Sequence, residues 1–485
     1  MSIDLPLYQV RPEQMDLSAK ETELFNELLA IWQQYLDGNI RNEAYYKGKL
    51  RVVSKDQNSP EELQRLKVVM GWGGKCVDVL AGRSVLKEFT SQGTGANDLL
   101  NAVGNNDLIT LYEQAVTSEL TDSCSFMTVS KGAPGEPDVI ISAHSALDAV
   151  AIYDYRKKRI KAGLVVLDIE EDENKQRKPT WVNMYTDEKT YSMRLLQAGI
   201  VGSEHWVTEI ADNPLGRPLM EPLVYRPSII RPFGKSRINR TVRSLIDRAL
   251  AVGARTETSA VFYTWPQRYL LNVDKKTVQE MASSKMGMYV DRMLLVSTNK
   301  NGDSPQYGQL SQMTMQPHID HLEMLAKQFA SEACVPLDEV GIVFDNPSSA
   351  DAMYAAQQRL IVEAEHVNRI NGAALKNVAL IALACIRNTA RIDELSDDDK
   401  TIIPRFENPL RPSMAARADY AIKVASAVPE YAQTRYFWED LGYEKADIDG
   451  IMREVRQAQT SNIIAQMAAQ QAARTPAPTP QAGDE

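Results

Sequence analysis

One stretch constrains the fold of this chain more than any other. Residues 350–391 contain no proline and are rich in residues that favour helices. A stripe recurs there at spacings of three and four residues, which is the pattern of one helix face. Its members are Leu360, Ala364, Val367, Asn371, Ala374, Val378, Ile381 and Cys385. At the usual rise per residue the helix is about 60 Å long. Other elements or other subunits must therefore pack along it, and we expect a bend at Asn371–Gly372.

A loop at residues 336–349 leads into this helix. Its tip reads Asp345-Asn346-Pro347-Ser348-Ser349. Ser348 or Ser349 is a suitable N-cap, because a serine hydroxyl can accept a hydrogen bond from a free amide of the first turn. Asp351, three residues after Ser348, resembles the second half of a capping box. Taken alone, the loop is most simply an ordinary connector that ends in a cap.

Several short motifs occur in a fixed order along the chain. They are Tyr45-Tyr46-Lys47-Gly48, Val77-Asp78-Val79-Leu80-Ala81-Gly82-Arg83, Asn213-Pro214-Leu215-Gly216-Arg217-Pro218 with Pro222-Leu223-Val224, Gly234-Lys235-Ser236-Arg237-Ile238, and Pro347-Ser348-Ser349-Ala350-Asp351-Ala352. No single motif is specific, but their order and spacing over some 300 residues are. Together they resemble the siphophage-type portal proteins of tailed double-stranded-DNA bacteriophages.

The resemblance implies the fold of a portal protomer, which belongs to the α+β class. It implies a wing at residues 1–235, a stem helix at 236–258, a small β-containing clip at 259–316, a second stem helix at 317–335, a tunnel loop at 336–350, a long kinked tunnel helix at 351–392, a helical crown at 393–473 and a disordered tail at 474–485.

The resemblance also implies a function and partners. Twelve copies would form a ring-shaped channel at one capsid vertex, through which double-stranded DNA is packaged and ejected. A terminase large subunit and head-completion or adaptor proteins would dock on this ring, and the major capsid and scaffolding proteins would surround it. The protein would be part of the virion, assembled in the cytoplasm of the bacterial host.

Composition sets wider limits. A chain of 485 residues is too long for one core and suggests two to four domains. No run of 18 apolar residues and no secretion signal are visible, so we expect no membrane span. The four cysteines are far apart and are expected to be reduced. The net charge of −10 argues against a DNA-coating protein, but not against one that lets DNA pass without gripping it.

Periodicity predicts an α+β first half. Ser18 and Glu21 form a capping box before a helix that ends at Gly38, and two further helices are expected at 60–82 and 106–120. Short β-rich runs follow, with a charged hairpin loop at 170–178. The predicted strands are 126–129, 139–141, 149–153, 160–167, 181–185 and 206–210.

The second half is mostly helical. The sequence predicts two helices around a small β-containing insert, and the second of them opens with Pro317 at its first position. Two helices are also expected near the C-terminus. The predicted helices are 236–255, 317–334, 413–428 and 446–473; the predicted strands of the insert are 268–273 and 292–297, followed by a turn at 299–308.

No motif for catalysis is present, so we predict no catalytic residue, metal or cofactor. The run Gly71-Trp72-Gly73-Gly74-Lys75 lacks the spacing and the Ser/Thr of a phosphate-binding loop, and a turn or close packing explains it better. His318 and His321 lie one helical turn apart, but no third ligand is near them in sequence. No two acidic residues form a defensible acid–base pair.

Two sets of residues are candidates for function. Arg237, Arg240 and Arg248 are expected on the polar side of the 236–255 helix. They could be solvated, could face DNA in a channel, or could pair with acids such as Asp320 or Glu323 of a neighbouring stem helix. The other set is the loop tip, where Asp345 repels phosphate and Asn346, Ser348 and Ser349 offer only neutral hydrogen bonds, as in a low-friction collar around DNA.

Two other classes of protein are alternatives to a portal. One is a DNA-packaging enzyme subunit, such as a terminase or nuclease, which would need a nucleotide site or clustered metal-binding carboxylates. The other is a capsid assembly factor without a channel.

Overall fold

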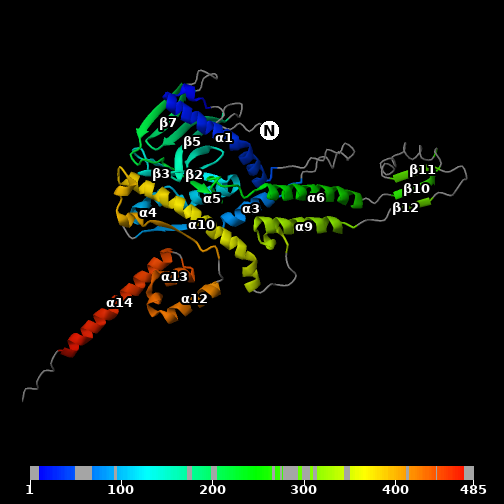
Figure 1. Cartoon of the computed structure of the whole chain (residues 1–485). Coiled ribbons are helices and arrows are strands. Elements are labelled where there is room, and N and C mark those ends of the chain that lie inside the picture. The colour runs from blue at the N-terminus through cyan, green and yellow to red at the C-terminus, as the bar shows by residue number, and fades with distance from the viewer. Residues whose placement is uncertain are drawn as a thin grey trace, which may run out of the picture. The chain divides into compact units, whose positions relative to one another are not determined.

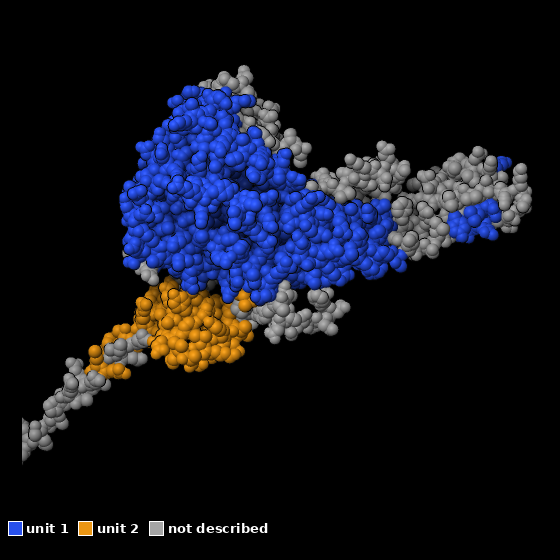
Figure 2. All heavy atoms as spheres, in the orientation of Figure 1, with its two compact units in different colours: residues 1–409 blue, residues 410–485 orange. Residues whose placement is uncertain are grey.

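A computed structural model divides the chain into two compact units, residues 1–409 and 410–485, coloured blue and orange in Figure 2. Helices and sheets both contribute to the fold, so the predicted α+β class is confirmed. The structure describes residues 10–49, 68–91, 95–171, 177–197, 205–264, 268–273, 276, 293–297, 306–309, 314–342, 350–410, 414–443 and 445–474.

The first unit contains an antiparallel five-stranded meander with the strand order β4-β5-β6-β7-β8. Its strands are β4 (Ala149–Asp154), β5 (Arg159–Glu171), β6 (Arg177–Thr186), β7 (Lys189–Gln197) and β8 (His205–Asp212). Adjacent residues of one strand face opposite sides. Leu164 therefore packs towards helix α1 (Ala19–Tyr46), whereas Val165 belongs to a core shared with a second sheet.

That second sheet has the order β3-β2-β9, with β2 (Cys124–Lys131), β3 (Val139–Ser145) and β9 (Met220–Val224). Phe126 and Met220 face the meander, and Met127 and Leu223 face the main core. Helices α5 (Leu108–Asp122) and α10 (Ala350–Ile386) cover that other side (Figure 1). The main core also includes residues of α3 (Trp72–Ala81) and α4 (Gly95–Asn105).

Helix α10 is the predicted long helix, with 37 residues and a length of about 55 Å. It ends at Ile386 rather than at the predicted Arg391, and Asn388 takes the left-handed conformation just beyond it. The helix is continuous through Asn371–Gly372. Among the described residues, Gln357–Ile386 is long and apolar enough to cross a membrane, but half of this segment is buried inside the protein as a core helix.

Helices α6 (Arg240–Thr264) and α9 (Gln316–Ala333) pack against each other, as Figure 1 shows. Proline lies in the first turn of α9, as predicted. Between the two helices in sequence are strands β10 (Arg268–Val273), β11 (Met293–Ser297) and β12 (Gln306–Gln309) in one small sheet. The turn predicted at 299–308 is wrong at its end, because residues 306–309 pair with β10.

The N-terminal helices differ from the prediction at their ends. The capping box of Ser18 and Glu21 is confirmed, but α1 continues past Gly38 to Tyr46. The helix expected at 60–82 begins at Trp72 within the described residues, since residues 50–67 lie outside them. All six strands predicted between residues 125 and 224 are present, and β7 and β9 complete the two sheets.

A two-stranded sheet and short turns complete the first unit. Strand β13 (Ile403–Phe406) pairs with β1 (Leu86–Thr90), and residues up to 409 belong with this unit. The short helices are η2 (Pro12–Gln14), η3 (Leu337–Val340), η4 (Ile392–Glu394) and α11 (Asp397–Lys400).

The second unit is helical. It contains α12 (Met414–Ala427), η5 (Pro429–Gln433), α13 (Arg435–Leu441) and α14 (Lys445–Arg474). The two predicted helices of this region are confirmed, whereas α13 was not predicted. Arg435 forms an ion pair of 2.9 Å with Asp449 and thereby joins α13 to α14.

Candidate functional site

A charged groove of about 1080 Å³ lies between α6 and α9. Arg240 and Arg248 line it from α6, and Asp320, Glu323, Lys327 and Glu332 line it from α9. Both arginines lie on the exposed side of α6, as predicted. Leu245 and Met324 add apolar surface between these charges.

Arg240 and Arg248 form no ion pair with any residue that the structure describes. The acids across the groove have other contacts: Asp320 accepts a hydrogen bond from Gln316 at 2.8 Å, and Glu323 pairs with Lys327 at 2.6 Å. The predicted pairing of the arginines with these acids is therefore not made within one protomer. Both guanidinium groups are open to another molecule.

Arg237 has a different position and corrects the prediction for that residue. Helix α6 begins only at Arg240, so the helical projection that placed Arg237 beside Arg240 and Arg248 does not apply to it. Its side chain is 5% exposed, and it faces neither a channel nor a neighbouring subunit.

The buried Arg237 joins four segments instead. It donates hydrogen bonds to the carbonyl of Cys76 in α3, to the carbonyl of Ala333 in α9 at 2.5 Å, and to the hydroxyl of Tyr225 after β9 at 3.1 Å. It also pairs with Glu363 of α10 at 2.8 Å. Burial raises the pKa of Glu363, but Arg237, Tyr225 and Arg226 together outweigh burial, so this pKa lies below its usual value.

A second buried polar cluster ties the middle of α10 to α5. The amide of Asn371 donates to the carboxyl of Glu119 at 2.6 Å and to the hydroxyl of Tyr112 at 3.3 Å. Ser84 lies 2.6 Å from the Tyr112 hydroxyl and donates to Asn368, also of α10, at 2.6 Å. Burial raises the pKa of Glu119 to about 8. The sequence pattern placed Asn371 in the apolar stripe and gave no sign of this cluster.

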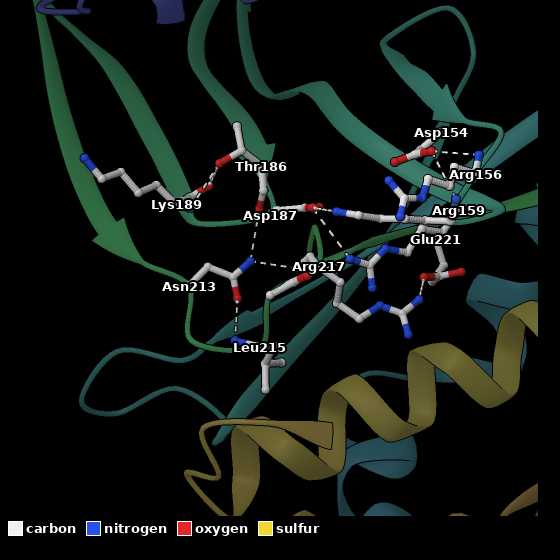
Figure 3. A network of polar contacts seen from close by, with 12 residues as sticks. Asp154, Arg156, Arg159, Thr186, Asp187, Lys189, Asn213, Leu215, Arg217 and Glu221 are labelled. Carbon is white, nitrogen blue, oxygen red and sulfur yellow. Dashed lines mark hydrogen bonds and ion pairs between the residues drawn. The ribbon is translucent and has the colours of Figure 1, made fainter. Parts of the chain in front are cut away.

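The turn motif at 213–218 organises a third network (Figure 3). The amide of Asn213 donates to the carbonyls of Thr186 at 3.0 Å and of Arg217 at 2.6 Å. Arg217 pairs with Glu221 of β9. Burial raises the pKa of Glu221 even though Arg217 acts in the opposite direction. Asn377 of α10 donates to the same carboxylate at 3.2 Å, so the motif connects both sheets to the long helix.

The base of the predicted tunnel loop is tied to α3. Lys75 pairs with Glu339 of η3 at 2.8 Å, and both side chains are about half exposed. Within the glycine run before Lys75, Gly73 serves close packing, because a Cβ there would lie 2.1 Å from the carbonyl oxygen of Tyr45. The tip residues Asp345, Asn346, Ser348 and Ser349 lie outside the described residues.

His318 contacts α6 through its ring nitrogen, which lies 3.0 Å from the hydroxyl of Ser259. Within the described part of the chain, no group of three or more His, Cys, Asp or Glu side chains is placed to hold a metal ion. Among the cysteines, Cys76 and Cys124 are buried thiols, and burial raises the pKa of both.

The fold and these sites define a protein built around one long core helix and an exposed helix pair. Residues 26–460 match the family described as "Phage portal protein, SPP1 Gp6-like". The chain therefore belongs to this family of portal proteins, as its motifs indicated. The family is structural rather than catalytic, so the prediction that the chain is not an enzyme is confirmed.

Curated relatives agree. The chain is 24% identical over 441 residues to the portal protein of Mycobacterium phage D29. This alignment covers 88% of this chain and 87% of the phage D29 protein. It is also 24% identical over 410 residues to the portal protein of Mycobacterium phage L5, with coverages of 82% and 81%.

Among solved structures, the neck of a native gene transfer agent particle computed with C12 symmetry is similar at 12% identity. The superposition covers 77% of this chain and 90% of the chain in the gene transfer agent neck, with a TM-score of 0.41. A chain of the native gene transfer agent virion is similar at 13% identity, 84% and 99% coverage and a TM-score of 0.41. These likenesses are distant, and the family assignment rests on the sequence matches.

Proposed function

We propose that identical copies of this chain form a cyclic ring at one vertex of a phage capsid, with a central channel through which double-stranded DNA is packaged and ejected. The observation that carries this proposal is the family match over residues 26–460. The ring is a virion component assembled in the host cytoplasm. Its partners are a terminase large subunit, a head-completion or adaptor protein, and the major capsid and scaffolding proteins.

We further propose that α6 and α9 are the stem of each subunit and that the strands between them form the clip. A helix pair with one side on the main core and an exposed, charged groove on the other supports this division. In a closed ring such a surface meets either a neighbouring subunit or the channel, because cyclic symmetry repeats every contact around the axis. Residues 336–350 are the tunnel loop, and the C-terminal helices are the crown.

Arg240 and Arg248 have two possible roles in this ring. Guanidinium groups that face the channel would bind DNA phosphates in every subunit. Guanidinium groups at a subunit boundary would pair with acids of the next stem, such as Asp320 or Glu323. Their lack of ion-pair partners within the described part of the protomer supports both roles equally. The neutral and acidic tip Asp345-Asn346-Pro347-Ser348-Ser349 would touch DNA without holding it.

Electron microscopy and mass measurement of the purified full chain test this proposal. We expect closed rings of ten or more subunits with a central hole. A protein that stays monomeric in both measurements would overturn the proposal of a ring. Irregular assemblies without a hole would favour the alternative of a capsid assembly factor without a channel.

A further inference from the structure

The connection between β9 and α6 exposes two adjacent isoleucines. Ile229 is 94% exposed and Ile230 is 85% exposed, the two highest values among the large apolar side chains that the structure describes. They lie at the tip of a loop at residues 227–232, which we call the isoleucine loop. Single exposed apolar residues are ordinary, but two neighbouring, almost fully exposed isoleucines are not explained by the fold of one protomer.

The isoleucine loop is held in one conformation. Prolines 227 and 232 bound it, and Ser228 and Arg231 exchange two backbone hydrogen bonds of 3.0 and 3.1 Å across its tip. Gly234 closes the loop with a φ of +68°, and a Cβ there would lie 2.1 Å from the carbonyl oxygen of Tyr225. A preorganised apolar tip loses little conformational freedom when it is buried by a partner.

The base of the loop is anchored to the buried Arg237 cluster. Arg226 takes a left-handed conformation with a φ of 49° and pairs with Glu363 at 2.6 Å. Phe233 packs edge-on against Phe126 of β2, with ring centroids 5.9 Å apart. The loop is therefore rigid at both ends, which is typical of a surface that makes a fixed contact.

From these features we propose that the isoleucine loop joins neighbouring protomers of the ring: Ile229 and Ile230 enter the groove between α6 and α9 of the next subunit. This inference rests on the proposed ring. A cyclic interface is head-to-tail, so every protomer must carry both a projecting surface and a different, complementary receiving surface. The isoleucine loop and the groove are such a pair.

Position and chemistry both support this match. The loop ends eight residues before Arg240, which lines the groove at the start of α6, and Glu332 lines it at the end of α9. In a ring whose axis runs along these helices, rotation keeps every residue at its own height, so the loop of one subunit lies near the level of the groove end that Arg240 and Glu332 line in the next. Met324, 42% exposed, offers apolar contact to the isoleucines, and the carboxylates of α9 can receive Arg231.

The first experiment compares assembly of the full chain with that of the double variant Ile229→Asp/Ile230→Asp. We expect rings from the natural sequence and a loss of at least tenfold in the ringed fraction of the variant, with an unchanged circular dichroism spectrum. The matched control is Leu196→Asp/Ile210→Asp, two residues of the meander that are 67% and 49% exposed, which should still form rings. Intact rings of the isoleucine variant, or equal loss in the control, would overturn the inference.

The second experiment locates the receiving surface. Ile230→Cys combined with Ser331→Cys, which lines the groove beside Glu332, should give a ladder of disulfide-linked oligomers under an added oxidant, since a disulfide requires Cα atoms within about 7 Å. Each single variant, and Ile230→Cys with Leu196→Cys, should give no ladder. Absence of the ladder from assembled rings would overturn the groove as the receiving surface. Absence of rings from the natural sequence would instead overturn the proposed function itself.

Discussion

The ion pair of Arg237 and Glu363 shows how one buried charge can be mistaken for a surface residue. Both side chains are nearly inaccessible, and each is satisfied by the other and by hydrogen bonds from separate segments. The sequence pattern placed Arg237 inside a helix at residues 236–255, whereas the helix begins only at Arg240. A difference of four residues in that boundary separates a solvated arginine from one at the junction of four elements.

The first prediction concerns this pair. Glu363→Ala leaves the buried Arg237 without a counter-charge, and we expect a loss of about 3–5 kcal/mol in the free energy of unfolding. Arg226→Gln is the matched control, because Arg226 pairs with the same carboxylate but is 46% exposed, so its loss should cost at most about 1 kcal/mol. Chemical denaturation at fixed protomer concentration measures both, and equal losses would contradict the assigned role of Arg237.

The second prediction concerns the pH dependence that comes from Glu119. Its folded-state pKa of about 8 lies above that of an unfolded chain, so between about pH 4.5 and 8 the folded protein binds more protons than the unfolded one. The contribution of Glu119 to stability therefore falls as pH rises through this window. Glu119→Gln retains a side-chain oxygen for Asn371 and cannot ionise, so its stability relative to the natural protein should increase from pH 5 to pH 8.

Denaturation midpoints of the two proteins, measured at several pH values, check this expectation. Asp122 is also buried with a raised pKa, and it remains in both proteins. The informative quantity is hence the difference between them. A difference that stays constant with pH would mean that Glu119 is already ionised in the folded state.

At the scale of elements, the sequence predicted strands and helices where residue types follow a repeating pattern. It did not predict features that depend on a single long-range contact. Six strands between residues 125 and 224 were found because they form short β-rich runs, whereas β7 and β9 were not predicted. Helix α1 was expected to stop at Gly38, yet a Cβ added at Gly38 would meet no atom within 4 Å, and the helix simply passes through this position. The hydrogen bond between Asn371 and Glu119 could not be predicted from the sequence, because 252 residues separate the two.

The third prediction tests the contact between α1 and α3 with two adjacent glycines. Gly73→Ala would place a Cβ 2.1 Å from the backbone of Tyr45, and we expect a loss of about 1–3 kcal/mol. At Gly74 the nearest atom is at an ordinary 3.5 Å, so Gly74→Ala should be neutral or should stabilise the helix by up to about 1 kcal/mol. Thermal unfolding of the two variants measures the contrast, and similar melting temperatures would refute the close approach.

At the scale of the whole molecule, the fourth prediction separates the two roles of the stem arginines. Arg240→Gln/Arg248→Gln should impair DNA packaging and leave ring assembly intact if the side chains face the channel. Loss of rings would assign them to the subunit boundary instead. Packaging assays and electron microscopy of the same preparation give both readouts.

The fifth prediction concerns the tip of the tunnel loop. Asp345→Lys would place a collar of cations around the DNA, because the substitution is repeated in every subunit. Each new phosphate contact releases counterions and adds affinity, so packaging should slow or stall and should recover as salt is raised. Packaging at the natural rate would show that the tip does not meet DNA.

Three of the polar residues along α10 have a mechanical consequence. Glu363, Asn371 and Asn377 bind partners in different elements, and they are spread over about 21 Å of the helix. Sliding α10 by one turn would move all three away from their partners at once and leave buried polar groups unpaired. These contacts therefore fix the position of α10 along its own axis. A displacement at its N-terminal end can travel to the far end only by carrying the surrounding body with it.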